Sequence, residues 1–436
     1  MLEGAAPVER SPFDLYNCWS GDTAEETQVL VDFGTIPWWT HPELRLAMMR
    51  PLSSALIAFD HYVLGKNQVA FHLHSMVWWA FLLVCTALLL RELLPVQVAS
   101  VAVLLFAVEE GHGLPLLWLA NRNALVSLSL GMLGLWSHIR WRREKDRSYL
   151  LLSVVMFSLG LLGGEWTMPI FAYLFAFELL GARGRLGIRF RALLPAATLG
   201  LLFLIAQHLL SYAALNSDVY VNPTSDPLNY LERVSKRFPV FFADLVLGVP
   251  AVWYQTGNPL RHIAVHAVLD WNLVSTQLWR KLPEWQFWHV VLGGVAGLVG
   301  LLVIRWGFRH QPSRLLRELR WLLLGALLSM LPMVASFPSS RLVLPASVGA
   351  SSIWAAILLA LLRHLRQRWS TLTVRSRGSM LALLLIMLLV QVLVSSINAQ
   401  REVRAYAYFF QSVRQWVLRS DIDDSEIEEQ HVFLLN

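Results

Sequence analysis

Ionisable and amide side chains stand beside long apolar runs at several places in this sequence, where they could do chemistry. They come from six separate segments: Arg50, His72, His74, Glu109, Glu110, His112, Asn121, Arg122, Asn123, Glu165 and Arg341. Carboxylates and imidazoles can act as general bases or bind a divalent cation, and arginine binds phosphate through two parallel donors. A charge in a bilayer is costly, so such residues usually have a function. We therefore predict that they form one functional cluster, against the alternative that they only extend into interfacial water.

The segment 109–112 combines two carboxylates with an imidazole. Glu109 or Glu110 is predicted to be the catalytic base. Glu109 and His112 would share one helix face, since they are three residues apart. They are therefore a weak candidate site for Mg²⁺ or Mn²⁺, and an exposed turn is the alternative. His72 and His74 are two residues apart and point to different sides of a helix. One should face the cluster while the other packs, and the sequence does not say which.

Two arginines are expected at the starts of helices. Arg122 lies between Asn121 and Asn123, and Arg341 directly follows the Pro-Ser-Ser segment 338–340. A helix N-terminus with an adjacent arginine favours anions. We expect these arginines to bind a phosphate or pyrophosphate, unless both only pair with lipid head groups.

A very tight turn precedes Glu165, which follows Gly163 and Gly164. The carboxylate is predicted either to pair with Arg122 or Arg341 or to contact a sugar hydroxyl.

The elements that must position these residues are membrane helices. The chain is 56% hydrophobic and 15% charged, whereas a soluble protein has about 25% charged residues. Since a spanning helix needs about 20 apolar residues, we predict an all-α polytopic membrane protein with about ten transmembrane helices. Their approximate ranges are 70–91, 96–108, 123–138, 149–163, 166–181, 192–211, 288–304, 321–336, 342–362 and 379–398.

Basic residues cluster in four loops, 139–148, 182–191, 305–320 and 363–377. The positive-inside rule makes these loops cytoplasmic, and it explains the net charge of +6 without a nucleic-acid partner. The predicted organisation has five parts: an outer segment 1–69, helices in 70–211, an outer loop 212–287, helices in 288–398 and an outer tail 399–436. The functional cluster then lies at the outer face.

Several outer segments have a character of their own. Residues 228–238 and 402–419 are amphipathic, which favours interfacial helices, with packing between helices as the alternative. The run 238–253 contains Asp244 and is bounded by prolines, so we predict an interfacial or re-entrant segment. Residues 37–39 (Pro-Trp-Trp) suit a membrane interface, and 421–429 is acidic. An outer N-terminal segment with no helix before it predicts a further helix upstream of Met1.

Several motifs resemble the GT-C superfamily of polytopic glycosyltransferases, which includes the protein O-mannosyltransferases. The resemblance rests on Arg50-Pro51-Leu52 followed by 59–79, on 118–136, on Gly164-Glu165 and on 339–356. The closest likeness is to uncharacterised bacterial membrane proteins that share the PWWTHPELRL, RPLSS and WLANRNAL wording.

The resemblance implies transfer of a sugar from a polyprenyl-phosphate donor to a glycan, lipid or protein acceptor. The reaction would take place at the periplasmic face of a bacterial inner membrane, with Arg122 and Arg341 stabilising the departing phosphate. The superfamily has its catalytic acid in the first outer loop, after a first helix. Asp14 and Asp32 lie in the corresponding loop here but match no motif, so the resemblance leaves open an acid upstream of this chain.

The remaining cluster residues, including Arg50, Asn121 and the histidines, would contact substrate. The alternative is a non-catalytic membrane protein: a transporter or flippase for a lipid-linked glycan, or an assembly partner. Transporters place polar residues on broken helices at mid-membrane depth, whereas the helix centres here are almost purely apolar.

Overall fold

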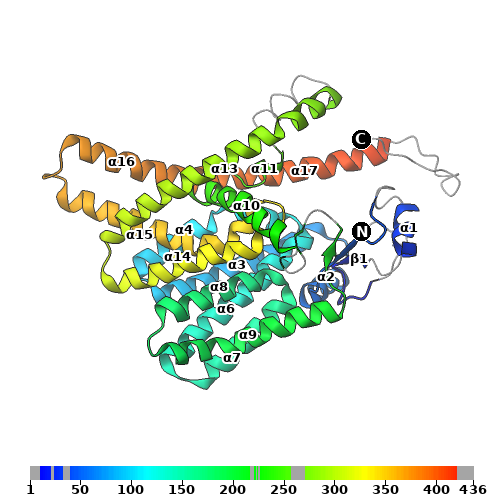
Figure 1. Ribbon diagram of the computed structural model, residues 1–436, viewed down its shortest axis with the longest axis horizontal. Coiled ribbons are helices and arrows are strands. Elements are labelled where there is room, and N and C mark those ends of the chain that lie inside the picture. The colour runs from blue at the N-terminus through cyan, green and yellow to red at the C-terminus, as the bar shows by residue number, and fades with distance from the viewer. Residues whose placement is uncertain are drawn as a thin grey trace.

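The computed structural model describes residues 10–20, 24–32, 40–216, 220–221, 223, 226–256 and 271–419. Helices dominate this part of the chain and run side by side as a bundle (Figure 1). The predicted interfacial segment 37–39, the acidic tail 421–429 and part of the loop 212–287 lie outside the described residues.

A small sheet joins the N-terminal region to the bundle. Strands β1 (Asn17–Trp19), β2 (Arg45–Ala47) and β3 (Ala214–Leu215) pair antiparallel in that order, and helix α1 (Ala24–Asp32) lies between the first two in sequence. Because β3 follows the long helix α9, the sheet holds the N-terminal segment against the end of that helix.

The first half of the bundle alternates long helices with short 3-10 turns. The elements are α2 (Pro51–Leu64), α3 (Gln68–Leu93), α4 (Val96–Ala107), η1 (Glu110–His112), α5 (Gly113–Leu117), η2 (Leu119–Asn121), α6 (Arg122–Glu144), α7 (Arg147–Gly163), η3 (Glu165–Thr167), α8 (Met168–Ala176), the π-helix η4 (Phe177–Gly181) and α9 (Leu186–Leu209).

The second half contains the most buried helix and the most exposed one. The elements are α10 (Pro227–Leu247), α11 (Trp253–Thr256), α13 (Trp271–Arg309), α14 (Ser313–Met333), η5 (Ser340–Val343), α15 (Leu344–Arg368), α16 (Val374–Leu388), the π-helix η6 (Leu389–Val394) and α17 (Ser395–Arg419). Each of the ten predicted apolar runs lies in helical structure.

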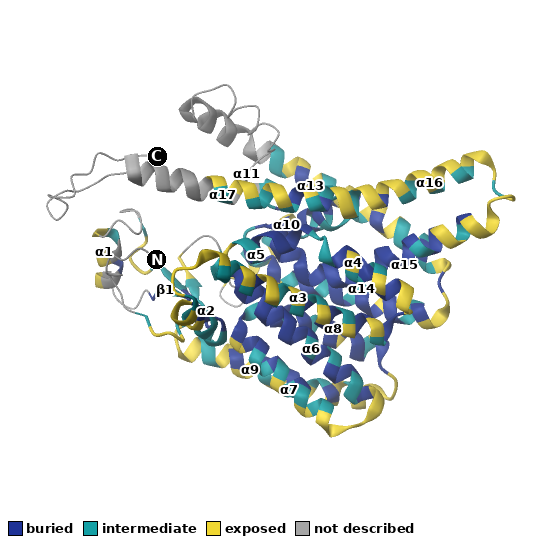
Figure 2. Cartoon of the chain, turned by 180° about the vertical axis from the view of Figure 1, so that it is seen from behind, coloured by how far each residue is buried: buried dark blue, intermediate teal, exposed yellow. Residues whose placement is uncertain are grey.

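The all-α polytopic membrane fold is confirmed, but ten spans are not established. Among the described residues, five helices are long and apolar enough to cross a bilayer: α3, α9, Trp285–Arg309, Ser340–Arg368 and Val374–Ala405. A sixth results if α4 and the segment Glu110–Leu117, which meet at a bend of 52°, count as one broken span. The centre of the bundle is α15, since 89% of its apolar window is buried (Figure 2).

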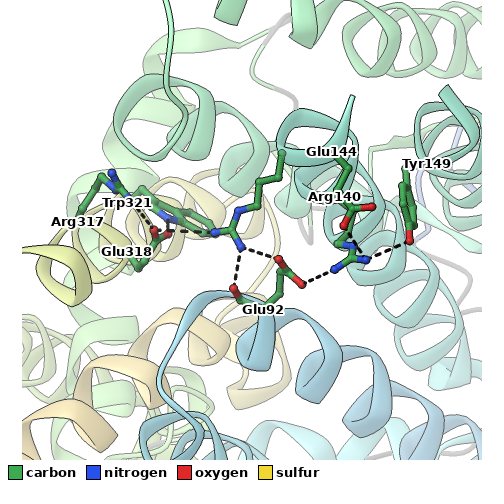
Figure 3. Close-up of polar contacts among 8 residues, drawn as sticks. Glu92, Arg140, Glu144, Tyr149, Arg317, Glu318 and Trp321 are labelled. Carbon is green, nitrogen blue, oxygen red and sulfur yellow. Dashed lines mark hydrogen bonds and ion pairs between the residues drawn. The ribbon is translucent and has the colours of Figure 1, made fainter. Parts of the chain in front are cut away.

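The basic loops gather at one end of this bundle. Glu92 at the end of α3 accepts hydrogen bonds from Arg140 (3.2 Å) and Arg143 (2.6 Å) at the end of α6. Arg143 also lies 3.9 Å from Glu318 near the start of α14, and Trp321 donates to Glu318 (2.7 Å; Figure 3).

The other two basic loops belong to the same end. Arg142 of α6 bonds Glu178 of η4 (2.7 Å), just before the loop 182–191. Arg363 of α15 lies 3.4 Å from Gln311, which precedes α14. The turns α6–α7 and α15–α16 accordingly lie opposite α2 and the N-terminal region (Figure 1).

The run 238–253 does not start a separate element at Pro239, because α10 continues through this residue to Leu247 and ends at Gly248, in the left-handed conformation (φ 64°). An interfacial or re-entrant position for this run stays a prediction. Proline removes one backbone donor, yet the helix survives because α13 packs tightly on this turn. A Cβ at Gly293 of α13 would lie 2.0 Å from the Pro239 carbonyl oxygen, so only glycine permits this approach. Asp244 is thereby placed on a regular helix.

The topology is tested by cysteine labelling in intact cells. After replacement of Cys18 and Cys85, Lys145→Cys and Arg314→Cys in the basic loops should resist an impermeant maleimide, because those loops are predicted to be cytoplasmic. Glu232→Cys on the exposed face of α10 should label. If Lys145→Cys and Arg314→Cys label and Glu232→Cys does not, the orientation is the opposite of the predicted one.

Candidate functional site

The polar side chains at the end of the bundle opposite the basic loops form two adjoining networks, and a fully buried arginine organises the first. Arg122 is 2% exposed and forms an ion pair with Asp60 of α2, itself 1% exposed. Its Nε donates to Ser75 Oγ (2.9 Å), and its Nη2 donates to the Phe71 carbonyl (2.8 Å). His74 Nδ1 lies 2.6 Å from Asp60 Oδ1 and 3.2 Å from Arg122 Nη1.

We call Arg122, Asp60, His74 and Ser75 the Arg122 network. Each of the three guanidinium nitrogens of Arg122 already bonds Ser75, Asp60 or the Phe71 carbonyl, so the side chain is fixed by protein partners. His74 is the histidine of its pair that faces the site, and it also accepts a bond from Trp78 Nε1 (3.0 Å). His72 is half-buried on the other side of α3, outside this network.

A second ion pair holds the tight turn at Gly164, whose φ of 150° strongly favours glycine. Arg50 Nε donates to Glu165 Oε2 (2.8 Å), and its guanidinium also lies over the Tyr16 ring (4.8 Å). The predicted pairing of Glu165 with Arg122 or Arg341 is therefore wrong, because Arg50 takes that place. Burial alone would raise the pKa of the Glu165 carboxyl, but the Arg50 guanidinium outweighs it and lowers that pKa.

Arg341 is held at the border between the networks. It is 8% exposed, donates from Nη1 to Asn121 Oδ1 (3.0 Å), and lies between two aromatic rings. Its Cζ is 5.6 Å from the centroid of Trp118 and 5.7 Å from that of Phe337. Aromatic faces favour a cation, particularly where water is excluded.

The second network surrounds a small cavity between α4, α10, α15 and η6, which we call the carboxylate cavity. It has room for only a water-sized group or two. Its lining residues are Leu105, Glu109, Glu110, Asp244, Leu245, Gly248, Ser347, Ala350, Ser351, Val390, Gln391 and Ser395.

Two buried acids face one another in this cavity. Glu110 is 2% exposed and Asp244 is 3% exposed. Asn398 donates to Glu110 Oε2 (2.6 Å) and the Ala251 amide donates to Asp244 Oδ2 (2.7 Å). Among the described residues, the remaining oxygens, Glu110 Oε1 and Asp244 Oδ1, accept no hydrogen bond of regular geometry, although the two carboxyl groups lie within reach of each other and of the Ser340 hydroxyl.

Two ionised carboxylates cannot both remain stable in contact at low dielectric. A proton shared between Glu110 and Asp244 is the simplest compensation, as in other carboxyl pairs. Burial raises the pKa of Asp244 to about 6. The pair can therefore accept or release a proton near neutral pH, which a general base must do.

Further charges surround the pair. Glu109 lines the cavity with its Oε2 accepting the Gly111 amide (2.8 Å), and Glu402 of α17 is close enough to interact with Asp244. Arg341 interacts electrostatically with Glu402 and with Glu165. The cavity is therefore acidic, with a single arginine at its edge among the described side chains.

Glu109 and His112, the predicted cation ligands, each make other contacts, and the cation site stays a prediction. His112 is 3% exposed, its Nε2 bonds the Phe106 carbonyl (2.9 Å), and its ring packs on Phe106 and Trp79. Within the described ranges, no group of three or more His, Cys, Asp or Glu residues is placed to hold a metal ion. The predicted cavity shared by Glu109, His112, Arg122, Glu165 and Arg341 is thus replaced by two networks that meet at Arg341.

The two acids proposed from the N-terminal loop lie elsewhere. Asp14 accepts hydrogen bonds from Tyr212 (2.8 Å) and Asn17 (3.0 Å), so it secures the N-terminal segment. Asp32 is exposed on α1 and accepts from Gln28 (2.7 Å). Neither lines the carboxylate cavity.

Sequence reasoning missed Asp60, Asn398 and Glu402 as members of the site, and it noted Asp244 only as an interruption of an apolar run. The available signal was a lone polar residue in an apolar segment, which Asp60 and Asp244 both give.

Comparisons with known proteins give a distant likeness. No family model and no curated protein match the sequence. The apo oligosaccharyltransferase of Archaeoglobus fulgidus aligns with 81% of this chain over 48% of its own length. The sequence identity is 14% and the TM-score is 0.43. AglB of that organism, in complex with an inhibitory peptide and a dolichol-phosphate, overlaps 82% with 48% of its own, at 14% identity and 0.45.

The chain thus spans about half the length of these oligosaccharyltransferases. Similarity at this level does not transfer their activity, so function has to be argued from the side chains.

The Arg122 network is expected to be structural. Asp60→Asn leaves a buried guanidinium without its counter-charge, which costs about 3–5 kcal/mol of stability. The double variant Asp60→Leu/Arg122→Met should lose less than Asp60→Asn. The exposed pair of Glu232 and Lys236 is the control, since Lys236→Gln should cost less than about 1 kcal/mol. Thermal unfolding in detergent measures all of them, and an Asp60→Asn protein as stable as the control would contradict the role.

The acid pair predicts a pH-dependent stability. Because the folded-state pKa of Asp244 is raised to about 6, the folded state binds the proton more tightly than the unfolded chain. Stability is then lost as pH rises from about 4 through 6, on the order of 3 kcal/mol. Asp244→Asn should remove this loss, as measured by unfolding from pH 4 to 8. Parallel pH curves for the two proteins would exclude a shared proton.

Proposed function

We propose that the protein is a membrane glycosyltransferase that moves a sugar from a polyprenyl-phosphate donor to an acceptor at the outer face of the cytoplasmic membrane. One observation carries the proposal: two buried acids face one another in a cavity, and Glu402, which interacts with one of them, also interacts with an arginine that lies between two aromatic rings. This combination supplies a base and an oxyanion ligand at one membrane depth.

The reaction needs both groups at once. Glu110 or Asp244 accepts the proton of a hydroxyl group on the acceptor. At the same time the oxygen of that hydroxyl attacks the anomeric carbon of the sugar. The new bond joins that carbon to the acceptor oxygen, and the bond to the phosphate oxygen breaks. Arg341 stabilises the negative charge that develops on the departing polyprenyl phosphate, as a fixed donor does in other transfer reactions.

Charge dictates how the donor would lie. Glu109, Glu110 and Asp244 repel a phosphate, while Arg341 attracts it. The phosphate therefore belongs on the Arg341 side and the sugar on the side of the acids, and a cavity of this size admits the sugar only after the surrounding helices move apart. Its isoprenoid tail would remain in the bilayer.

One residue expected from the sequence takes a different role in this proposal. Arg122 is not assigned as a phosphate ligand, because each of its guanidinium nitrogens already bonds Asp60, Ser75 or Phe71. It fixes the start of α6 and, through the adjoining Asn121, the position of Arg341. A divalent cation near Glu109 stays a prediction.

Binding and transfer measurements on purified protein test the proposal. Arg341→Lys keeps the charge but loses the two parallel donors, so affinity for a short-chain polyprenyl phosphate should fall about tenfold. Arg233→Lys on α10, outside the cavity, is the matched control and should bind normally.

The acid variants separate binding from chemistry. Glu110→Gln and Asp244→Asn should still bind the polyprenyl phosphate but slow sugar transfer by about 10²–10⁴-fold, which is the usual contribution of a general base. Normal binding by Arg341→Lys would remove the phosphate role. Binding by the wild type without any transfer, across glycan, lipid and peptide acceptors, would favour a non-catalytic carrier of lipid-linked glycans.

A further inference from the structure

The last membrane helix of the described chain is attached to the bundle by unusually little surface. The segment Val374–Ala405 comprises α16, η6 and the start of α17, and 11% of its apolar window is buried. Figure 2 shows α16 exposed along most of its length. Within this segment the residues classed as buried are Met387, Ser395 and Asn398, so two of its three buried side chains are polar.

These polar side chains all bind at the carboxylate cavity. Ser395 Oγ donates to the Val108 carbonyl (3.1 Å) and accepts the Glu110 amide (2.9 Å). Asn398 Nδ2 donates to Glu110 Oε2 (2.6 Å) and to the Gly248 carbonyl (2.8 Å).

One turn deeper, Gln391 Nε2 donates to the Leu245 carbonyl (3.1 Å). We call Gln391, Ser395 and Asn398 the polar latch.

The backbone is adapted to this contact. The helix widens into a π-helix at Leu389–Val394, and Val390, Gln391 and Ser395 all line the cavity. Such π-segments occur frequently at functional sites.

The deeper part of the cavity lining is apolar and comes from Leu105, Leu245, Ala350 and Val390. The cavity thus runs from the acids to an apolar wall, to which the latched helix contributes Val390.

Within a bilayer no hydrophobic force drives an apolar helix against its neighbours, so polar bonds and packing decide whether it stays docked. A helix with little buried surface therefore depends on its latch. The latch acceptor is Glu110, a proposed base. Ligand binding or protonation at Glu110 weakens the charge-assisted bond from Asn398.

We propose that the segment Val374–Ala405 is a lateral gate of the carboxylate cavity, closed by the polar latch. Its release opens a path from the bilayer to Glu110 for the chain of a lipid substrate. That the lipid is a polyprenyl phosphate rests on the proposed function; the gate rests on the contacts of the helix.

Thiol labelling tests the gate without any substrate. In a background lacking Cys18 and Cys85, Ser351→Cys in the cavity reports access of a lipid-soluble maleimide from the bilayer. Asn398→Leu removes the latch bond to Glu110 and should raise the labelling rate about tenfold. The matched control is Ser329→Cys in α14, equally buried but away from the cavity, whose rate should not change.

A disulfide tests the opposite direction. A Cβ at Gly248 would lie 3.6 Å from Val394 Cβ, which suits a disulfide. Oxidised Gly248→Cys/Val394→Cys should lower the labelling of Ser351→Cys below that of the latched protein. The positive φ at Gly248 strains this variant, so loosening alone would raise the labelling rate rather than lower it.

The gate is overturned if the labelling rate of Ser351→Cys changes neither in the latch variant nor after the disulfide forms. Equal increases at Ser351→Cys and Ser329→Cys also overturn it, since they indicate general loosening. The proposed function fails independently if the protein binds no polyprenyl phosphate while labelling follows the latch as expected.

Discussion

The cost of burying charge at the outer end of the bundle organises the structure, and the ion pair of Arg122 with Asp60 is its main consequence. Two such groups are stable in a low-dielectric interior only when they are paired and fully hydrogen-bonded. Asp60 comes from α2, Ser75 from α3 and Arg122 from α6, so this requirement fixes three helices relative to one another. Asn121, the neighbour of Arg122 in the chain, accepts a hydrogen bond from Arg341 and so fixes the position of Arg341 as well.

The same rule makes the carboxylate cavity exceptional. At the inner end, Glu92 is matched by Arg140 and Arg143. At the outer end Glu165 is matched by Arg50. Glu110 and Asp244, by contrast, oppose each other, and among the described residues one oxygen of each accepts no hydrogen bond of regular geometry. Glu92 and Glu165 are neutralised by arginines, whereas Glu110 and Asp244 are left able to exchange a proton, and this contrast is the physical basis of the proposed chemistry.

The sequence predicts the helices well because apolar runs must be buried in lipid or in the bundle wherever their partners lie. It also places the basic loops together, since charge patterning reflects topology. Pairings are different. Glu165 could have met any of three arginines, and the choice of Arg50 depends on how α2 crosses the turn at Gly164. The choice between His72 and His74 likewise depends on packing around Asp60.

The site was less predictable than the fold for the same reason. Glu110 and Asp244 are far apart in sequence and meet because α4 bends beside α10, a bend that no local pattern announces. Asn398 and Glu402 belong to a helix whose amphipathic pattern indicates a surface position, and their contact with the cavity becomes visible once α17 is in place.

Photocrosslinking with a polyprenyl phosphate that carries a photoreactive group next to its phosphate tests the central claim most directly. Mass spectrometry of the crosslinked wild-type protein in lipid nanodiscs would identify the attached peptides. We predict that they contain residues 109–118 and 337–343, the two segments that surround Arg341 and the carboxylate cavity. Crosslinks confined to the exposed faces of α9 and α16, with none in these segments, would contradict the assignment of the site.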